Sequence, residues 1–240
     1  MLDGVGTKRL VVRAVGPGLS DYGVADALAD PDLSLIRDAV ELARNDGWEA
    51  ANAELFSSLG AFALAPGSSD AALVTTLGAG VFTTPVGNGG DSGVVLLEVY
   101  DTEGAVGTTE LTNTSTRALV GTGDATLNTG FVIAGTGTIK LLMRTIGPTL
   151  SEFDVVGVLA DPTMSWISGG EVVATNDDWG KATNAAEIAA AAISTGAFTL
   201  AEESKDAAIL IELPAGVYSV VTEGVEQTVG TALVELYRVP

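Results

Sequence analysis

The sequence contains one phrase twice: "VRAVGPGLS" at residues 12–20 returns as "MRTIGPTLS" at residues 143–151. The same shift, 143 − 12 = 131 positions, carries "NDGW", which ends at Trp48, onto "NDDW", which ends at Trp179. Several motifs that recur in one order at one spacing indicate a duplicated module. We therefore expect two copies of one fold.

Each copy begins with a Val-, Leu- and Ile-rich segment that ends in Gly-Pro, a sequence that cannot continue a β-ladder. Later segments alternate apolar with small or polar residues, as half-buried strands do, and glycines favour hairpin turns at Gly80 and Gly216. The Ala- and Glu-rich stretches at residues 49–59 and 184–194 favour one short helix per copy. The pattern predicts an all-β fold of two tandem antiparallel β-sandwich (jelly-roll-like) modules, each with one short helix.

The two expected modules are unequal. We place repeat 1 at residues 1–104 and repeat 2 at residues 105–240, where residues 105–135 form a connector that carries two further strands and leads into a glycine hairpin turn at 135–137. Leu111 would map to position 111 − 131 = −20, so repeat 1 lacks its first strands. Unless the connector covers it, repeat 1 has an open sheet edge.

Composition excludes several classes of function. Eleven Lys and Arg against 31 Asp and Glu give a net charge of −20, which repels phosphates, so we expect no nucleic-acid partner. With no Cys and no His, the chain has no thiolate nucleophile, no imidazole base and no Cys- or His-bound metal. We assign no catalytic residue and expect no enzyme activity. The apolar runs are far shorter than the ~20 residues that a membrane span needs, so we expect none.

The second copy carries a series of recognisable phrases: "STRALVGTGDATLNTGFVIAGTGTIKLLMRTIGPTLS", "LADPTMSW", "ATNDDWG", "AAILIELPAGVYSVV" and "GTALVELYRV". In these phrases the chain resembles the tandem β-rich repeat module of large secreted or surface proteins of Verrucomicrobia, Planctomycetes and related bacteria, over residues 112–240 and more loosely over 4–101. The "LPAGVYSVVTEG" segment is also similar to bacterial pre-peptidase C-terminal domains. The resemblance implies a non-catalytic domain that is extracellular or on the cell surface, although no signal peptide is present in this numbering.

Two Asx-rich turns precede the expected helices. They contain Asn45 and Asp46 in repeat 1, and Asn176, Asp177 and Asp178 in repeat 2. Since Ca²⁺ takes about six to eight oxygen ligands from loops of this kind, these residues are candidate calcium ligands, and calcium is the one cofactor we consider. The competing interpretation is that they shape a turn and cap the helix, with the following Trp in the core. The full EF-hand spacing is absent, which favours the cap interpretation.

Two charge pairs recur in the copies. Arg13 and Arg144 lie on strands that we expect to be buried, and Glu98 and Glu235 lie on the closing strand of each copy. A buried charge is costly unless it is paired, so we predict structural ion pairs between Arg13 and Glu98 and between Arg144 and Glu235. A catalytic acid–base pair is the alternative, but repetition in both copies indicates a scaffold.

These observations favour a non-catalytic extracellular structural or adhesive protein. The open edge of repeat 1 is suited to strand addition, and self-association through that edge would build a filament or surface layer. The alternative is a calcium- or carbohydrate-binding accessory module of a larger secreted protein. The three Trp and four Tyr residues are candidates for the sugar platform of such a module, but Trp48 and Trp179 occupy equivalent places in the repeat, which indicates core residues.

Overall fold

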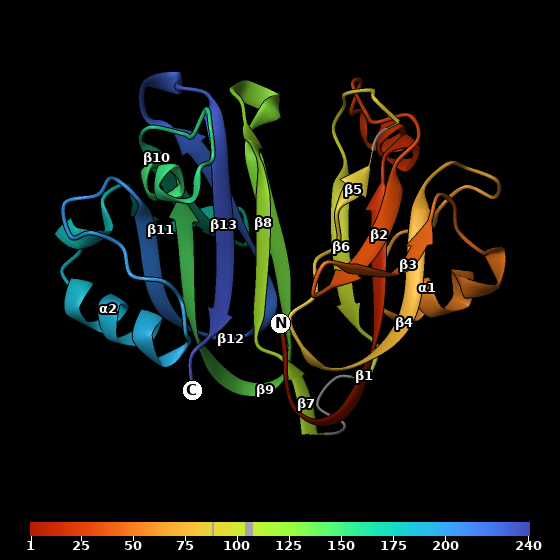
Figure 1. Ribbon diagram of the computed structural model, residues 1–240, viewed down its shortest axis with the longest axis horizontal. Coiled ribbons are helices and arrows are strands. Elements are labelled where there is room, and N and C mark those ends of the chain that lie inside the picture. The colour runs from red at the N-terminus through yellow and green to blue at the C-terminus, as the bar shows by residue number, and fades with distance from the viewer. Residues whose placement is uncertain (88, 104–107) are drawn as a thin grey trace. The chain divides into compact units, whose positions relative to one another are not determined.

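A computed structural model describes residues 1–87, 89–103 and 108–240 (Figure 1). Strands hold 51% of the residues and helices 17%, which confirms the predicted all-β fold of sandwich type. The chain divides into two compact units, Met1–Leu111 and Thr112–Pro240. The boundary that we expected after residue 104 lies outside the described residues. The division falls after Leu111, because the last strand of unit 1 pairs with its first strand.

Unit 1 contains two small antiparallel sheets. One has the order β4–β1–β6, with β7 also pairing with β1, and the other has the order β3–β2–β5. The elements of unit 1 are β1 (Leu2–Val15), the 3₁₀ helix η1 (Pro17–Tyr22), β2 (Asp32–Arg37), β3 (Val40–Asn45), η2 (Ala50–Asn52), α1 (Ala53–Ser58), β4 (Ala71–Gly80), β5 (Val86–Gly87), β6 (Leu96–Asp101) and β7 (Thr108–Leu111).

Unit 2 has six strands in the hydrogen-bonded order β11–β10–β12–β9–β13–β8. Its elements are β8 (Asn113–Val120), η3 (Gly123–Ala125), β9 (Leu127–Ile146), η4 (Pro148–Phe153), β10 (Pro162–Ser168), β11 (Glu171–Asn176), η5 (Trp179–Lys181), α2 (Ala185–Ser194), β12 (Ala207–Gly224), η6 (Val225–Gln227) and β13 (Gly230–Arg238). Both strands of the connector, β8 and the first half of β9, pair within this unit.

The two long strands of unit 2 bend and so serve both halves of its sandwich. The first half of β9 pairs with residues 216–222 of β12, the second half pairs with residues 207–214, and the register shifts between them. The predicted hairpin turns at residues 135–137 and at Gly216 are therefore wrong. Gly135 and Gly137 adopt φ angles of 99° and 95° inside a continuing strand, where glycine permits a bend.

The predicted hairpin turn at Gly80 is wrong for a related reason. Gly80 is the last residue of β4, and the chain that follows pairs with β2 instead of returning along β4. Thr83 exchanges backbone hydrogen bonds with Ile36, and Val86 pairs with Leu33. The turn residue thus transfers the chain from one sheet of unit 1 to the other.

The central strands of unit 2 are buried on both faces. Met143 of β9 packs with Trp166 of β10 in the core of the sandwich, whereas Leu142 packs with Ile188 of α2 on the opposite face. Successive side chains of a strand point to opposite faces, so neighbouring residues enter different cores. Figure 1 shows α2 lying outside the strands of this unit, where it covers the second core.

Unit 1 repeats this arrangement on a smaller scale. Val11 and Val15 of β1 pack against Phe56 of α1, and Leu10 packs on the other face with Leu35 of β2. Each unit therefore has a sheet with a helix on one face and a second sheet layer on the other. None of the helices in the described ranges has the length and apolar character needed to cross a lipid bilayer.

Candidate functional site

The repeated Gly-Pro phrase is held in place by a buried carboxylate in each unit. The Oδ1 atom of Asp70 accepts hydrogen bonds from the backbone N–H groups of Gly16 (2.9 Å) and Gly18 (3.1 Å). In unit 2, Asp206 Oδ1 accepts from Gly147 N–H (2.8 Å), and its Oδ2 accepts from the Thr149 hydroxyl. Both aspartates are fully buried. Asp70, just before β4, thus holds the turn that follows β1, and Asp206, just before β12, holds the turn that follows β9.

The glycine of this phrase is required by a close backbone approach. A Cβ atom on Gly16 would lie 2.0 Å from the carbonyl oxygen of Leu28, and one on Gly147 would lie 2.2 Å from that of Leu159. Neither glycine has a positive φ angle, so space, and not backbone conformation, selects glycine here. The duplicated phrase is therefore part of the scaffold of each unit.

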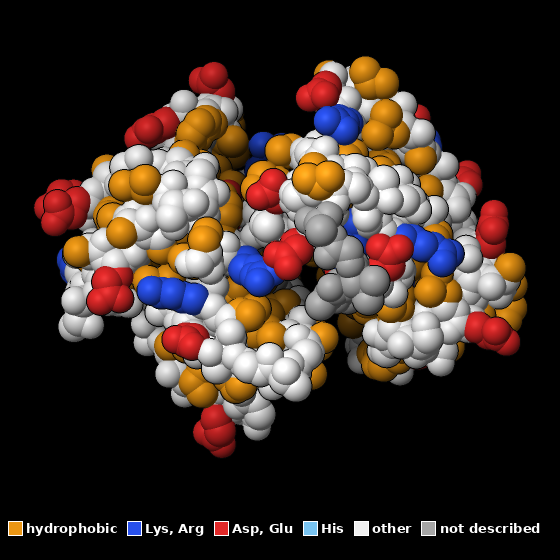
Figure 2. Space-filling model, turned by 90° about the horizontal axis from the view of Figure 1, so that it is seen from below, with side chains coloured by type: hydrophobic (Ala, Val, Ile, Leu, Met, Phe, Trp, Pro, Cys, Tyr) orange, Lys and Arg blue, Asp and Glu red, His pale blue; other side chains and the backbone are white. Residues whose placement is uncertain are grey.

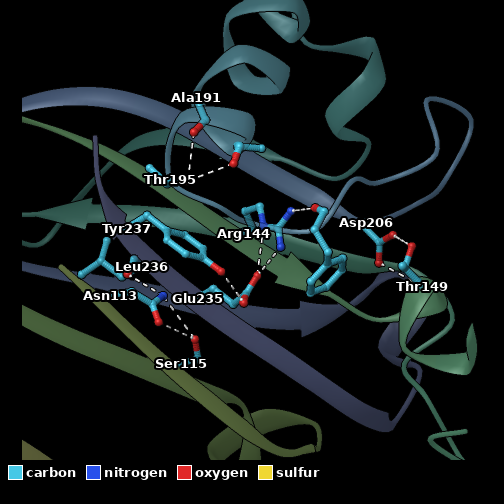
Figure 3. A network of polar contacts seen from close by, with 12 residues as sticks. Asn113, Ser115, Arg144, Thr149, Ala191, Thr195, Asp206, Glu235, Leu236 and Tyr237 are labelled. Atoms are coloured by element: carbon cyan, nitrogen blue, oxygen red, sulfur yellow. Dashed lines mark hydrogen bonds and ion pairs between the residues drawn. The ribbon is translucent and has the colours of Figure 1, made fainter. Parts of the chain in front are cut away.

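The structure brings Arg144 and Glu235 together in unit 2 (Figure 3). Arg144 donates from Nε (3.0 Å) and from Nη2 (2.5 Å) to Glu235 Oε2, and from Nη1 to the carbonyl oxygen of Phe198. Its guanidinium carbon lies 4.4 Å from the ring centroid of Phe198, within the range of a cation–π contact. The Tyr237 hydroxyl donates to the other carboxylate oxygen, so the network is closed.

The structure also brings Arg13 and Glu98 together in unit 1, with different geometry. Arg13 Nε lies 2.9 Å from Glu98 Oε2, but its hydrogen is not aligned with that oxygen, and neither atom has a hydrogen bond to any described residue. Arg13 Nη1 donates to the carbonyl oxygen of Phe62 (2.9 Å), and Tyr100 donates to Glu98 Oε1 (2.6 Å). The pair in unit 1 is therefore held by charge attraction more than by directed hydrogen bonds.

Both tyrosines of these networks are held in their neutral form. Burial, followed by the hydrogen bond to Glu98, raises the pKa of Tyr100. Burial and then the charge of Glu235 raise the pKa of Tyr237. A tyrosinate at either position would face a carboxylate, and burial would weaken the hydration of both charges. The partners of each network in the described residues come from the same unit, which fits a structural role.

The candidate calcium residues are used mainly for internal contacts. The amide nitrogen of Asn45 donates to the carbonyl oxygen of Ala72 (2.9 Å), and Asn176 Oδ1 accepts from Ala208 N–H (2.8 Å). Asp178 forms an ion pair with Lys181 (2.6 Å). Asp46 and Asp177 are exposed. In the described part of the chain, no three acidic, His or Cys side chains are grouped as metal ligands would be.

The capping role predicted for these Asx residues is wrong. Neither α1 nor α2, nor the short helix before each, has a side-chain hydrogen bond at its N-terminus among the described residues. Asn45 instead makes an Asx turn with Gly47 N–H and reaches across to the neighbouring strand. The turn part of the interpretation holds for Asn45, because the amide oxygen accepts from the residue two positions on.

The two repeated tryptophans lie in the cores, as the sequence predicted. Trp179 is 7% exposed and donates from Nε1 to the carbonyl oxygen of Ala201 (3.0 Å). Trp48 is partly buried and donates to the Ser68 hydroxyl (3.2 Å), which in turn donates to Asp70. Sequence reasoning missed Asp70 and Asp206. Their signal was the Asp-Ala-Ala triplet, which stands at residues 70–72 and again at residues 206–208.

A shallow groove of about 290 Å³ lies in unit 2 between β11, the residues before α2, and β12. Its lining includes Thr175, Asn184 and Leu210, and no titratable side chain. The groove can therefore offer hydrogen bonds but neither an acid nor a base. Figure 2 shows acidic side chains scattered over the visible surface and not gathered in one patch.

The main difference between the units is at one sheet edge. In unit 2, β13 pairs with β9 on one side and with β8 on the other. In unit 1, β6 pairs with β1, and no described strand of that unit pairs with its other side. The strands correspond closely, because Glu98 faces Arg13 across the ladder as Glu235 faces Arg144. Unit 1 thus has the acceptor strand without the strand that covers it in unit 2.

Backbone geometry shows which groups face this edge. Thr102 N–H donates to the carbonyl oxygen of Arg9, so alternate residues of β6 before it also face β1. Leu97 and Val99 are the intervening residues, and their N–H and C=O groups point away from β1. The Val99 side chain is 38% exposed. The edge is a candidate binding site for an extended strand.

Comparisons with known proteins do not identify a family. No family model and no curated protein matches the chain. A structural comparison finds PNGF-II, in a structure in the P21 space group, at 9% sequence identity and a TM-score of 0.27. The match covers 99% of this chain, which spans 59% of the matched PNGF-II chain. The resemblance to the bacterial repeat module remains a prediction.

Proposed function

We propose that this chain is a non-catalytic structural or adhesive protein of the cell exterior, and that its copies assemble by strand addition at unit 1. The observation that carries the proposal is the edge of β6, since the equivalent edge of β13 is covered by a complete strand in unit 2. A sheet edge with outward N–H and C=O groups is a template for pairing with another chain. The location outside the cell is supported by the resemblance to secreted repeat modules.

The proposed contact joins two different surfaces, which determines the kind of assembly. A contact between the β6 edge and some other surface of a second copy is heterologous, so it leaves the β6 edge of the second copy available. Repetition of such a contact gives a filament unless the rotation closes into a ring. The net charge of −20 opposes close approach of copies, so assembly should be stronger when salt screens that charge.

The experiment compares proline at equivalent positions of the two units. In Val99→Pro, the lost N–H group faces the edge, so unit 1 should keep its melting temperature while assembly is lost. In Leu236→Pro, the lost N–H group faces Thr114 of β8, so unit 2 should be destabilised by about 3 kcal/mol. Light scattering and electron microscopy at high protein concentration, with and without calcium, measure assembly. A wild-type chain that stays monomeric under all these conditions would contradict the proposal.

A further inference from the structure

We infer that the strand added to β6 is the outer edge of β8 in a second copy of this chain. The inference rests on the proposed function and names the partner surface. Every described strand of unit 2 already pairs within that unit, so a second copy has no spare strand to donate from it. It can offer only a sheet edge. β8 ends the six-stranded sheet, with β13 on one side.

The backbone of β8 is suited to this contact. Arg238 N–H donates to the carbonyl oxygen of Thr112, so the even-numbered residues of β8 face β13. Ser115, Arg117 and Leu119 therefore direct their N–H and C=O groups away from the sheet. One contact uses one β6 edge and one β8 edge. Each copy has both edges, so every copy can pair with one neighbour through β6 and with another through β8 without any strand leaving its own unit.

Charge selects β8 among the strands at the sheet edges. Its one charged residue is Arg117, which is exposed. β6 carries Glu98 and Asp101 and no basic residue. Of the other strands that end a sheet in the described ranges, only β3 contains a basic residue, and it also contains an acidic one. In a chain with 31 acidic and 11 basic residues, β8 is the edge whose charge attracts β6.

An antiparallel register that keeps Leu97, Val99 and Asp101 all opposite residues of β8 satisfies both charge and packing. If Val99 lies opposite Arg117, then Leu97 lies opposite Leu119, and Asp101 lies opposite Ser115. Arg117 then lies diagonally across from Asp101, within reach of its carboxylate. Asp101 can keep its ion pair with Lys8 at the same time. Leu119, which is 68% exposed, is covered by Leu97. A shift of two residues that places Asp101 opposite Arg117 leaves Leu97 opposite residue 121, beyond the end of β8, and the shift in the other direction places Arg117 four residues from Asp101.

The absence of Cys makes this register directly testable by disulfide trapping. Chains carrying Leu97→Cys are mixed with chains carrying Leu119→Cys and oxidised. Opposite residues of an antiparallel pair lie within the range of a disulfide, so the mixture should give a cross-linked dimer. A chain with one cysteine cannot form an internal bridge. The control mixes Leu97→Cys with Ser115→Cys, which lies four residues away along β8 and should cross-link at least tenfold less.

A charge-reversal pair gives a second readout on uncross-linked protein. Arg117→Glu should raise the protein concentration needed for assembly about tenfold, because an attraction becomes a repulsion. Lys140→Glu makes the same change of net charge on another exposed residue and should have a smaller effect. If wild-type chains assemble but Leu97 and Leu119 variants do not cross-link, the partner is wrong while the proposed function stands. If wild-type chains do not assemble at all, both are overturned.

Discussion

Removing one member of the Arg144–Glu235 pair should destabilise unit 2 more than removing both. The two side chains are 1% and 6% exposed, so a charge left alone there stays buried. Arg144→Met leaves Glu235 with the Tyr237 hydroxyl, and Glu235→Leu leaves Arg144 with the carbonyl oxygen of Phe198. Each single substitution should lower the free energy of unfolding by about 3–5 kcal/mol.

The double variant Arg144→Met/Glu235→Leu should be within about 2 kcal/mol of wild type, because two apolar side chains of similar volume replace the pair. It is not expected to be neutral, since the Tyr237 hydroxyl loses its acceptor, which costs about 1–3 kcal/mol. The two substitutions are therefore strongly coupled. A coupling of this kind separates a buried ion pair from two residues that stabilise the unit independently.

Urea unfolding followed by tryptophan fluorescence measures these values. Trp166 is fully buried in unit 2, and a Trp48→Phe background removes the indole of unit 1. Lys181→Met is the control, because Lys181 is 80% exposed in its ion pair and should contribute far less to stability than the buried pair. Single-variant losses near that of the control, or losses that simply add in the double variant, would refute the assignment of a structural buried pair.

Three further predictions concern the turns and the buried tyrosine. Gly147→Ala should destabilise unit 2 by roughly 3 kcal/mol in urea unfolding, because the new Cβ would lie 2.2 Å from the Leu159 carbonyl oxygen. Gly130→Ala, whose nearest neighbour is at 3.8 Å inside β9, should instead be neutral or stabilise the unit by up to about 1 kcal/mol; the reverse order would contradict the close-approach argument. Burial raises the pKa of Tyr237 above its ordinary value of 10.0, so the unfolded state releases its proton first and stability falls as pH rises above that value; Tyr237→Phe should show a shallower fall, and equal slopes of stability against pH would exclude this cause. Calcium should leave the melting temperature unchanged, because the Asn side chains of both Asx turns bond to neighbouring strands; a rise in melting temperature that Asp177→Asn abolishes would instead establish a calcium site.

The features of the fold that the sequence predicted correctly were those that recur in both copies of the repeat. An arginine and a glutamate recur at equivalent positions of the two copies, so each pair should have the same structural environment. Because these positions are buried, the two opposite charges are expected to form an ion pair. The roles of the glycines could not be predicted in the same way. A glycine with positive φ suits a turn and a bend equally well, so the glycines at 135 and 137 predict a hairpin turn in the sequence but lie within β9 in the structure.

The carboxylates that hold the Gly-Pro turns were also beyond sequence reasoning. Asp70 lies 54 residues from Gly16, and Asp206 lies 59 residues from Gly147. An aspartate before an apolar segment is ordinarily an exposed turn residue. Only the packed unit shows that the carboxylate is buried and that the backbone N–H groups of a distant turn satisfy it.

The sequence by itself determined that the chain is duplicated and that it is built from strands, because repetition and side-chain alternation are local properties. The tertiary structure alone decided which sheet edges are covered by another strand. Strand β8 covers β13 through contacts such as that of Asn113 with Leu236, which are 123 residues apart. Pairing over such a separation depends on the whole sheet closing in one register, so only the folded unit shows that β6 is the edge without a partner strand among the described residues of unit 1.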